Sequence, residues 1–156
     1  MTGLPLLMGN DRSPNATFVQ VAGQAQRISA TQLRKAIFSS QTLQSLLLRF
    51  AQTFMIQATQ SAIANGRANL PERLARWVLM AQDRLGRAQL PLTHAFLAIT
   101  LGVRRAGITD ALSLLEGEGL IRVQRGKIIV LKRKGLEQRA SRSYGVPEAE
   151  YLRLIG

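Results

Sequence analysis

The sequence predicts a mainly α-helical fold with a small β component (α+β), built from one long helix and a winged helix-turn-helix. Two apolar helical segments, at about 93–100 and 104–116, are joined by the tight turn Leu101-Gly102-Val103. Two strand-like segments follow at 120–123 and 127–131, with Gly126 in the predicted turn at 124–126. Residues 39–65 carry apolar side chains at helical spacing, which predicts the long helix.

Composition and charge limit the function classes. The chain has 156 residues, of which 46% are hydrophobic, as is usual for one or two globular domains. Lys and Arg number 21 against 9 acidic residues, so the net charge of +12 favours an anionic partner such as nucleic acid. The absence of cysteine excludes disulfides and thiolate metal sites. Residues 1–10 do not resemble a secretory signal, and no apolar run could span a membrane, so we expect a cytoplasmic protein without a membrane partner.

The N-terminal part predicts less regular structure. Residues 1–14 are rich in Gly, Pro and Asn and predict a loop. Residues 18–21 and 24–28 have strand character, and the turn Ala22-Gly23 separates them. Ser29 is a suitable N-cap for a short helix that ends near Phe38.

The long helix predicted at 39–65 has an unusual surface. Leu43, Leu47, Phe50 and Phe54 form an apolar seam, and Arg49 is the only charged residue of the segment. A solvated helix usually carries more charge, so we expect packing on more than one side, as in a dimer interface. The alternative is a core helix that packs only within its own chain.

Helix caps and apolar spacing predict the C-terminal elements. Asn69, followed by Pro71 and Glu72, predicts the start of a helix that ends at Gly86. Its predicted buried face contains Leu74, Trp77, Val78, Ala81 and Leu85. The next two helices are expected to bury Leu97, Leu101, Ile108, Leu112 and Leu115. Lys134-Gly135 predicts a break before a short helix at 136–141, and residues 144–156 predict a loosely attached helix or tail.

The start of the second helix is the first candidate for DNA contact. Arg105 and Thr109 are four residues apart and share a helix face, and Arg104 precedes them. An arginine here can donate two hydrogen bonds to guanine O6 and N7, while its neighbour holds a base or a phosphate. Two arginines at the positive end of a helix do not stabilise it, which favours a role in binding.

The predicted hairpin, or wing, is the second candidate. Residues 121–134 contain no acid and six basic residues, Arg122, Arg125, Lys127, Lys132, Arg133 and Lys134. Arg125 and Lys127 at the tip suit contact with the DNA backbone or minor groove. Thr93, His94 and the amides at the start of the first helix could bind a phosphate.

No arrangement of residues predicts catalysis or a bound cofactor. The sequence lacks a nucleophile elbow and a phosphate-binding loop ending in Gly-Lys. His94 is the only histidine, and the nine acids are scattered, so we expect neither a metal site nor an enzyme.

Several motifs resemble the C-terminal half of bacterial Crp/Fnr-type transcription regulators. They are Leu74-Ala75-Arg76-Trp77, Leu92-Thr93, Phe96-Leu97-Ala98, Leu101-Gly102-Val103-Arg104-Arg105 and Gly119-Leu120-Ile121. The resemblance implies the remnant of a cyclic-nucleotide-binding-like β-roll at 1–38, a dimerisation helix at 39–66, a winged helix-turn-helix at 67–142 and a tail at 143–156. It also implies a homodimer that binds double-stranded DNA and contacts RNA polymerase.

The sequence departs from the family pattern at several positions. Arg12-Ser13 resembles the pair that holds a cyclic-nucleotide phosphate, but residues 3–8 lack the expected glutamate. Ala106 and Asp110 replace residues that read bases in many members, so we expect a different operator. Two other interpretations remain open: a truncated partner that modulates a full-length relative, and a degenerate ligand-sensing module.

Overall fold

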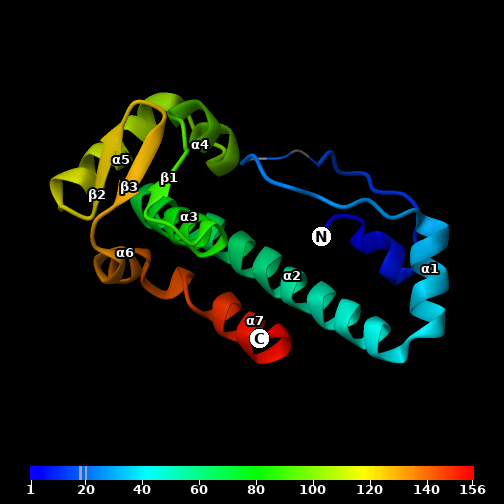
Figure 1. Cartoon of the computed structure of the whole chain (residues 1–156). Coiled ribbons are helices and arrows are strands. Elements are labelled where there is room, and N and C mark those ends of the chain that lie inside the picture. The colour runs from blue at the N-terminus through cyan, green and yellow to red at the C-terminus, as the bar shows by residue number, and fades with distance from the viewer. Residues whose placement is uncertain (18, 20) are drawn as a thin grey trace. The chain divides into compact units, whose positions relative to one another are not determined.

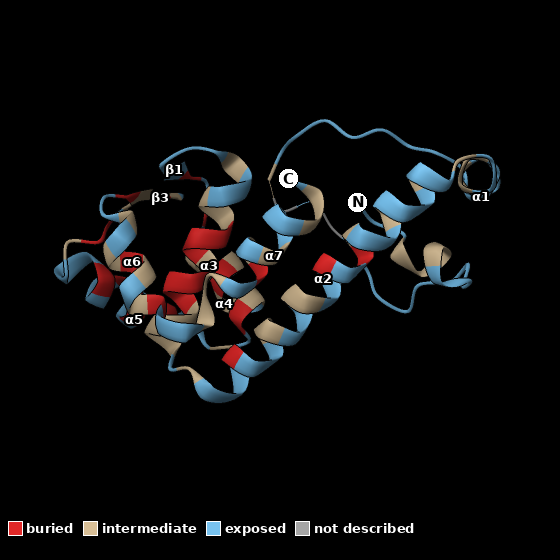
Figure 2. Ribbon diagram, turned by 90° about the horizontal axis from the view of Figure 1, so that it is seen from below, coloured by how far each residue is buried: buried red, intermediate tan, exposed pale blue. Residues whose placement is uncertain are grey.

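The computed structural model describes residues 1–17, 19 and 21–156, which form two compact units. Residues 1–58 and 147–156 make up the first unit, and residues 59–146 make up the second (Figure 1). Nearly all of the buried apolar side chains belong to the second unit (Figure 2). None of the described helices is long and apolar enough to cross a bilayer.

The first unit is helical where the structure describes regular elements. It contains η1 (Leu4–Met8), α1 (Ala30–Ser39), most of α2 (Gln41–Arg67) and nearly all of α7 (Val146–Ile155). Ser29 caps α1 as predicted, because its Oγ accepts from the Gln32 amide at 3.2 Å and Gln32 Oε1 accepts from the Ser29 amide at 3.3 Å. The bounds of α2 agree with the predicted long helix to within two residues.

The N-terminal predictions need correction. Residues 4–8 form η1 inside the segment that was expected to be a loop. The strand expected at 24–28 is wrong, because residues 22–29 are all described and none belongs to a strand. A strand is stable only when it pairs with another strand, and the weak alternation of residues 24–28 does not show whether a partner strand exists. The other expected strand includes Phe18 and Gln20, which lie outside the described residues.

The second unit is organised around α3 (Leu70–Leu85). Asn69 and Glu72 form the predicted capping box, and Gly86 ends the helix at φ 61°. Next come α4 (His94–Leu101) and α5 (Arg105–Gly117), which are joined by the predicted tight turn. Gly102 adopts φ 64° there, a conformation that favours glycine.

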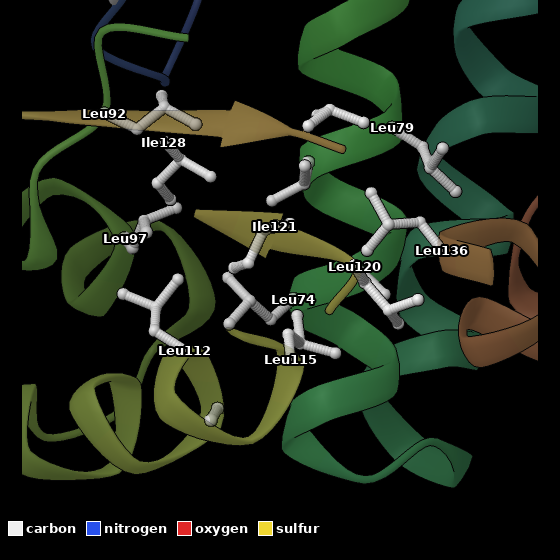
Figure 3. Close-up of a cluster of buried hydrophobic side chains, with 14 of the residues drawn as sticks. Leu74, Leu79, Leu92, Leu97, Leu112, Leu115, Leu120, Ile121, Ile128 and Leu136 are labelled. Carbon is white, nitrogen blue, oxygen red and sulfur yellow. The ribbon is translucent and has the colours of Figure 1, made fainter. Parts of the chain in front are cut away.

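A single apolar cluster holds α3, α4 and α5 together with the sheet and α6 (Arg133–Ala140) (Figure 3). Its largest fully buried side chains are Leu74, Val78, Leu79, Leu90, Leu97, Ile108, Leu112, Leu115, Ile121, Ile128 and Leu136. Trp77 packs against this cluster as predicted, and its ring meets Phe96 edge-on at 5.3 Å between centroids. The inward-facing residues predicted for α4 and α5 are confirmed.

The sheet has one strand more than the sequence predicts. Its strands β1 (Gln89–Leu90), β2 (Ile121–Gln124) and β3 (Lys127–Val130) pair antiparallel in the order β1-β3-β2. A strand of two residues shows no alternation, so the sequence offered no signal for β1. Gln124 pairs with Lys127, so the turn contains two residues, not the three predicted, and Gly126 takes φ 75°.

Helix α6 begins before the position that the sequence predicts. Gly135 was expected to break the chain, but it lies inside this helix. A Cβ at Gly135 would overlap the side chain of Leu120. Glycine at this position therefore permits close packing of α6 and does not mark a turn. The short helix η2 (Ser141–Ser143) follows α6.

We predict that Leu112→Ala will lower the free energy of unfolding by about 2–5 kcal/mol, because it leaves a cavity in the core. Leu112 is 1% exposed, whereas Leu114 on the same helix is 44% exposed. Leu114→Ala should therefore change the stability by only about 0.5 kcal/mol. The shift of the urea-unfolding midpoint measures both effects, and equal losses for the two variants would contradict this account of the core.

Candidate nucleic-acid interface

Helix α5 exposes one polar face because its other face is fixed in the core. Ile108, Leu112 and Leu115 are buried at spacings of four and three residues. The side of the helix opposite them carries Ala106, Asp110 and Ser113, all of which are exposed.

Arg105 and Thr109 flank this exposed face on one side. Arg104 is the N-cap residue of α5, and both arginines at its start are exposed. The predicted sharing of an outward face by Arg105 and Thr109 therefore agrees with the structure.

The start of α4 lies beside this part of α5. Thr93 caps α4, and its Oγ1 accepts from the Phe96 amide at 3.2 Å. Nδ1 of His94 lies 3.2 Å from Thr109 Oγ1, and that hydroxyl donates to the Arg105 carbonyl at 3.2 Å. Because the hydroxyl proton is used there, the contact fits a His94 ring with its proton on Nδ1. The sequence identified both residues but did not predict that they touch.

Arg73 holds the turn between the two helices. Its guanidinium donates to the backbone carbonyl of Leu101 and, at 3.1 Å, to Asn65 Oδ1. These bonds connect the end of α4 to α3 and to the last turns of α2. The sequence analysis did not identify Arg73 as part of the site. The only signal for it was a positive charge on a helix whose buried face is largely apolar.

The wing formed by β2 and β3 presents several free cations. Arg122 and Arg125 are exposed, and Lys127 is half-buried at the hairpin turn. The Val123 amide donates to Glu116 Oε1 at 2.7 Å, which ties β2 to the last turns of α5. Lys132 and Lys134 are also exposed, just beyond the hairpin.

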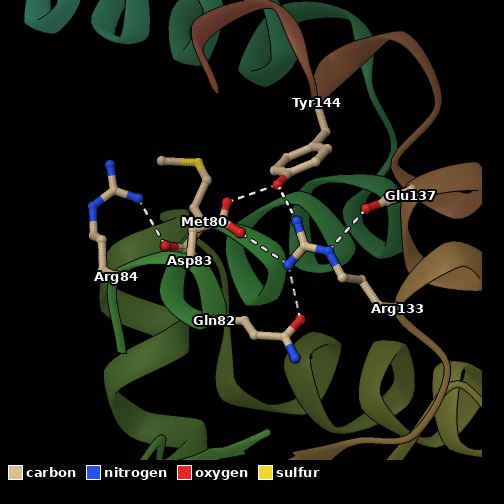
Figure 4. Close-up of polar contacts among 7 residues, drawn as sticks. All are labelled: Met80, Gln82, Asp83, Arg84, Arg133, Glu137 and Tyr144. Carbon is tan, nitrogen blue, oxygen red and sulfur yellow. Dashed lines mark hydrogen bonds and ion pairs between the residues drawn. The ribbon is translucent and has the colours of Figure 1, made fainter. Parts of the chain in front are cut away.

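Arg133 does not belong with the basic residues of the wing, contrary to the sequence interpretation. It lies in α6 and forms ion pairs with Asp83 and Glu137, each at 2.9 Å (Figure 4). It also donates to Gln82 Oε1 at 3.0 Å and to the Tyr144 hydroxyl at 2.6 Å. Burial alone would lower the pKa of Arg133, but the charge and hydrogen bond of Asp83, with help from Tyr144, raise it. This cation therefore holds α6 to the end of α3.

The predicted phosphate-holding pair lies in the first unit. Arg12 and Ser13 are both exposed and belong to no helix or strand. Ser13 Oγ donates to the Asn15 carbonyl at 3.3 Å, and the Arg12 amide donates to Asn10 Oδ1 at 3.0 Å. Anion binding by this pair stays a prediction.

Helix α4, a three-residue turn, helix α5 and the β2–β3 hairpin together define a winged helix-turn-helix domain. Residues 72–139 match the Crp-like helix-turn-helix domain family. The resemblance to Crp/Fnr regulators is thereby confirmed over the C-terminal portion of the chain.

Solved structures of Crp/Fnr regulators are similar to this chain. A regulator from Eubacterium rectale is 28% identical with a TM-score of 0.52, and the alignment covers 60% of this chain and 45% of that one. One from Thermus thermophilus is also 28% identical, with a TM-score of 0.53 and coverage of 58% and 50%. FixK2 from Bradyrhizobium japonicum shares the fold at 20% identity, with a TM-score of 0.67 and coverage of 73% and 60%.

The chain thus spans about half the length of these solved structures. A comparison with curated proteins gives no match to its sequence.

We predict that Arg133→Met will lower the free energy of unfolding by about 1–2 kcal/mol, because it removes the ion pair with Asp83 and the hydrogen bonds to Gln82 and Tyr144. The side chain of Arg133 is 38% exposed, so water screens part of the interaction, and 1 M salt should reduce the loss. Lys134→Met removes the same charge from an exposed neighbour and should change stability by only about 0.5 kcal/mol. Urea unfolding at low and high salt compares the two variants, and equal stability would show that the network contributes nothing.

Proposed function

We propose that this chain binds double-stranded DNA as a homodimer and regulates transcription in the manner of Crp/Fnr proteins. Helix α5 enters the major groove, and the wing contacts the DNA backbone. The observation that carries the proposal is the exposure of the Arg104 and Arg105 side chains and their lack of ion pairs within the described residues. Both lie at the start of a helix whose opposite face is fixed in the core.

Each candidate side chain takes a distinct part in this proposal. Arg105 donates to guanine O6 and N7, and Arg104 binds a phosphate beside it. Thr93 and His94 contact a phosphate at the start of α4, where backbone amides add to the positive potential. Arg125 and Lys127 at the wing tip contact the backbone of the flanking DNA.

The proposed homodimer forms through α2. The face of α2 that we assign to the interface carries Leu43, Leu47, Phe50 and Phe54 at spacings of four, three and four residues. Phe54 is 51% exposed in the single chain, and the other three are half-buried. Between Gln41 and Asn65 the helix carries one charge, Arg49. A second copy of α2 would cover this surface without burying further charge. Two-fold symmetry then places the DNA half-sites about one helical turn apart. Contact with RNA polymerase enters this proposal only through the family resemblance.

The salt dependence of duplex binding tests the proposal as a whole. Phosphate contacts by lysine and arginine release counterions, so the logarithm of the binding constant should fall linearly with the logarithm of salt concentration. Fluorescence anisotropy with a labelled duplex gives this slope, and a flat line would rule the proposal out.

We predict that Arg105→Ala will lower discrimination against a changed guanine pair by about 1–3 kcal/mol while changing non-specific affinity little. Lys127→Ala should weaken binding to all sequences alike and reduce the salt slope by about 1. Competition between specific and non-specific duplexes measures both variants. If the two substitutions exchange these effects, the assigned contacts are wrong.

We predict that Phe54→Glu will shift the protein from dimer to monomer, because it places a charge in the apolar surface of α2. Gln52→Glu adds the same charge on the opposite side of the helix and should leave the dimer intact. Phe54 is 51% exposed in the single chain, so the substitution should not unfold it. Light scattering after size-exclusion chromatography gives the molar mass, and a wild-type monomer would refute the dimer.

A further inference from the structure

Asp110 is the one acid of the second unit without a partner. Residues 59–146, all of which the structure describes, contain six acids. Asp83 and Glu137 pair with Arg133, and Glu118 pairs with Arg139 at 3.4 Å. Glu72 caps α3, and Glu116 accepts from the Val123 amide. The Asp110 side chain alone makes no hydrogen bond or ion pair.

The position of Asp110 on α5 indicates what its unpaired charge would meet in the proposed complex with DNA. It is exposed on α5, on the side directly opposite the buried Ile108, Ala111 and Leu115. In the docking proposed above, this is the side that faces the base edges. Asp110 therefore meets DNA without a cation from its own domain to neutralise it.

A carboxylate near DNA is repelled by the phosphates, so its approach to a base needs a compensating hydrogen bond. An ionised carboxylate only accepts hydrogen bonds. In the major groove the available donors are the amino groups of cytosine N4 and adenine N6. The adenine donor stands beside the N7 acceptor, which would repel the second carboxylate oxygen. Cytosine N4 is thus the base atom that suits Asp110.

We propose that Asp110 is a specificity-determining residue that selects a cytosine in each DNA half-site. This inference rests on the proposed function. Five residues separate Asp110 from Arg105, which at 1.5 Å per residue is about 7.5 Å along the helix axis. At 3.4 Å per base pair, a helix lying along the groove places the selected cytosine about two base pairs from the guanine read by Arg105.

Selection from a randomised duplex library, performed on the full chain, tests this assignment. The wild type should enrich a cytosine at one position near the selected guanine. Replacing that cytosine should weaken wild-type binding about fivefold or more. Asp110→Ala should lose this preference, with less than about a twofold difference among the four bases there. Asp110→Asn should shift the preference to adenine, because an amide can both accept from N6 and donate to N7.

Asp11→Asn serves as the matched control, since it removes the same charge outside the helix-turn-helix domain. It should keep the cytosine preference. If Asp110→Ala raises affinity for all sequences and leaves the base profile unchanged, Asp110 is only a repulsive charge and the inference is wrong. A protein that binds no duplex in a salt-dependent way would instead refute the proposed function, so the two failures are distinguishable.

Discussion

The burial of one face of α5 is the constraint on which the rest of the second unit depends. Ile108, Leu112 and Leu115 are almost fully buried, in one apolar cluster with α3 and the sheet. At about 1.5–3 kcal/mol for each buried side chain, these three contribute about 4.5–9 kcal/mol. That is comparable with the net stability of a typical domain, so α5 cannot rotate about its axis without unfolding the unit. The direction in which its polar side chains point is therefore determined by its apolar ones.

The same constraint explains why the helix-turn-helix was the most predictable part of the chain. Its signals are local: Thr93 caps α4, Gly102 takes the left-handed conformation, and the apolar spacing of α5 identifies its buried face. The caps at Ser29 and Asn69 were predictable for the same reason.

Features that depend on distant partners could not be predicted. β1 exists only because β3, about forty residues later, pairs with it. Gly135 resembled a helix breaker because nothing local reveals the Leu120 side chain that packs over it. In the candidate site, the sequence identified His94 and Thr109 separately, but only the fold of α4 against α5 brings them into contact.

The positive charge of the chain separates into two groups that sequence alone cannot distinguish. Arg133 and Arg139 form ion pairs, and Arg73 and the buried Arg76 donate to backbone carbonyls, so these cations stabilise the fold. Arg104, Arg105 and Arg125 are exposed and make no such contacts among the described residues. The count of 21 lysines and arginines therefore overstates the number of cations available to a partner, and the position of the unpaired cations is more informative than their number.

The strand order β1-β3-β2 makes β1 and β2 the two edges of the sheet, and Glu116 accepts a hydrogen bond from the Val123 amide of β2. Such edges can recruit strands from other molecules and start fibre growth. Here β1 offers two residues and β2 offers four, with exposed Arg122 and Gln124 on β2. Strand addition would bring the Arg122 guanidinium of one copy near that of another. We therefore expect these short, charged edges to disfavour strand addition between copies of the protein.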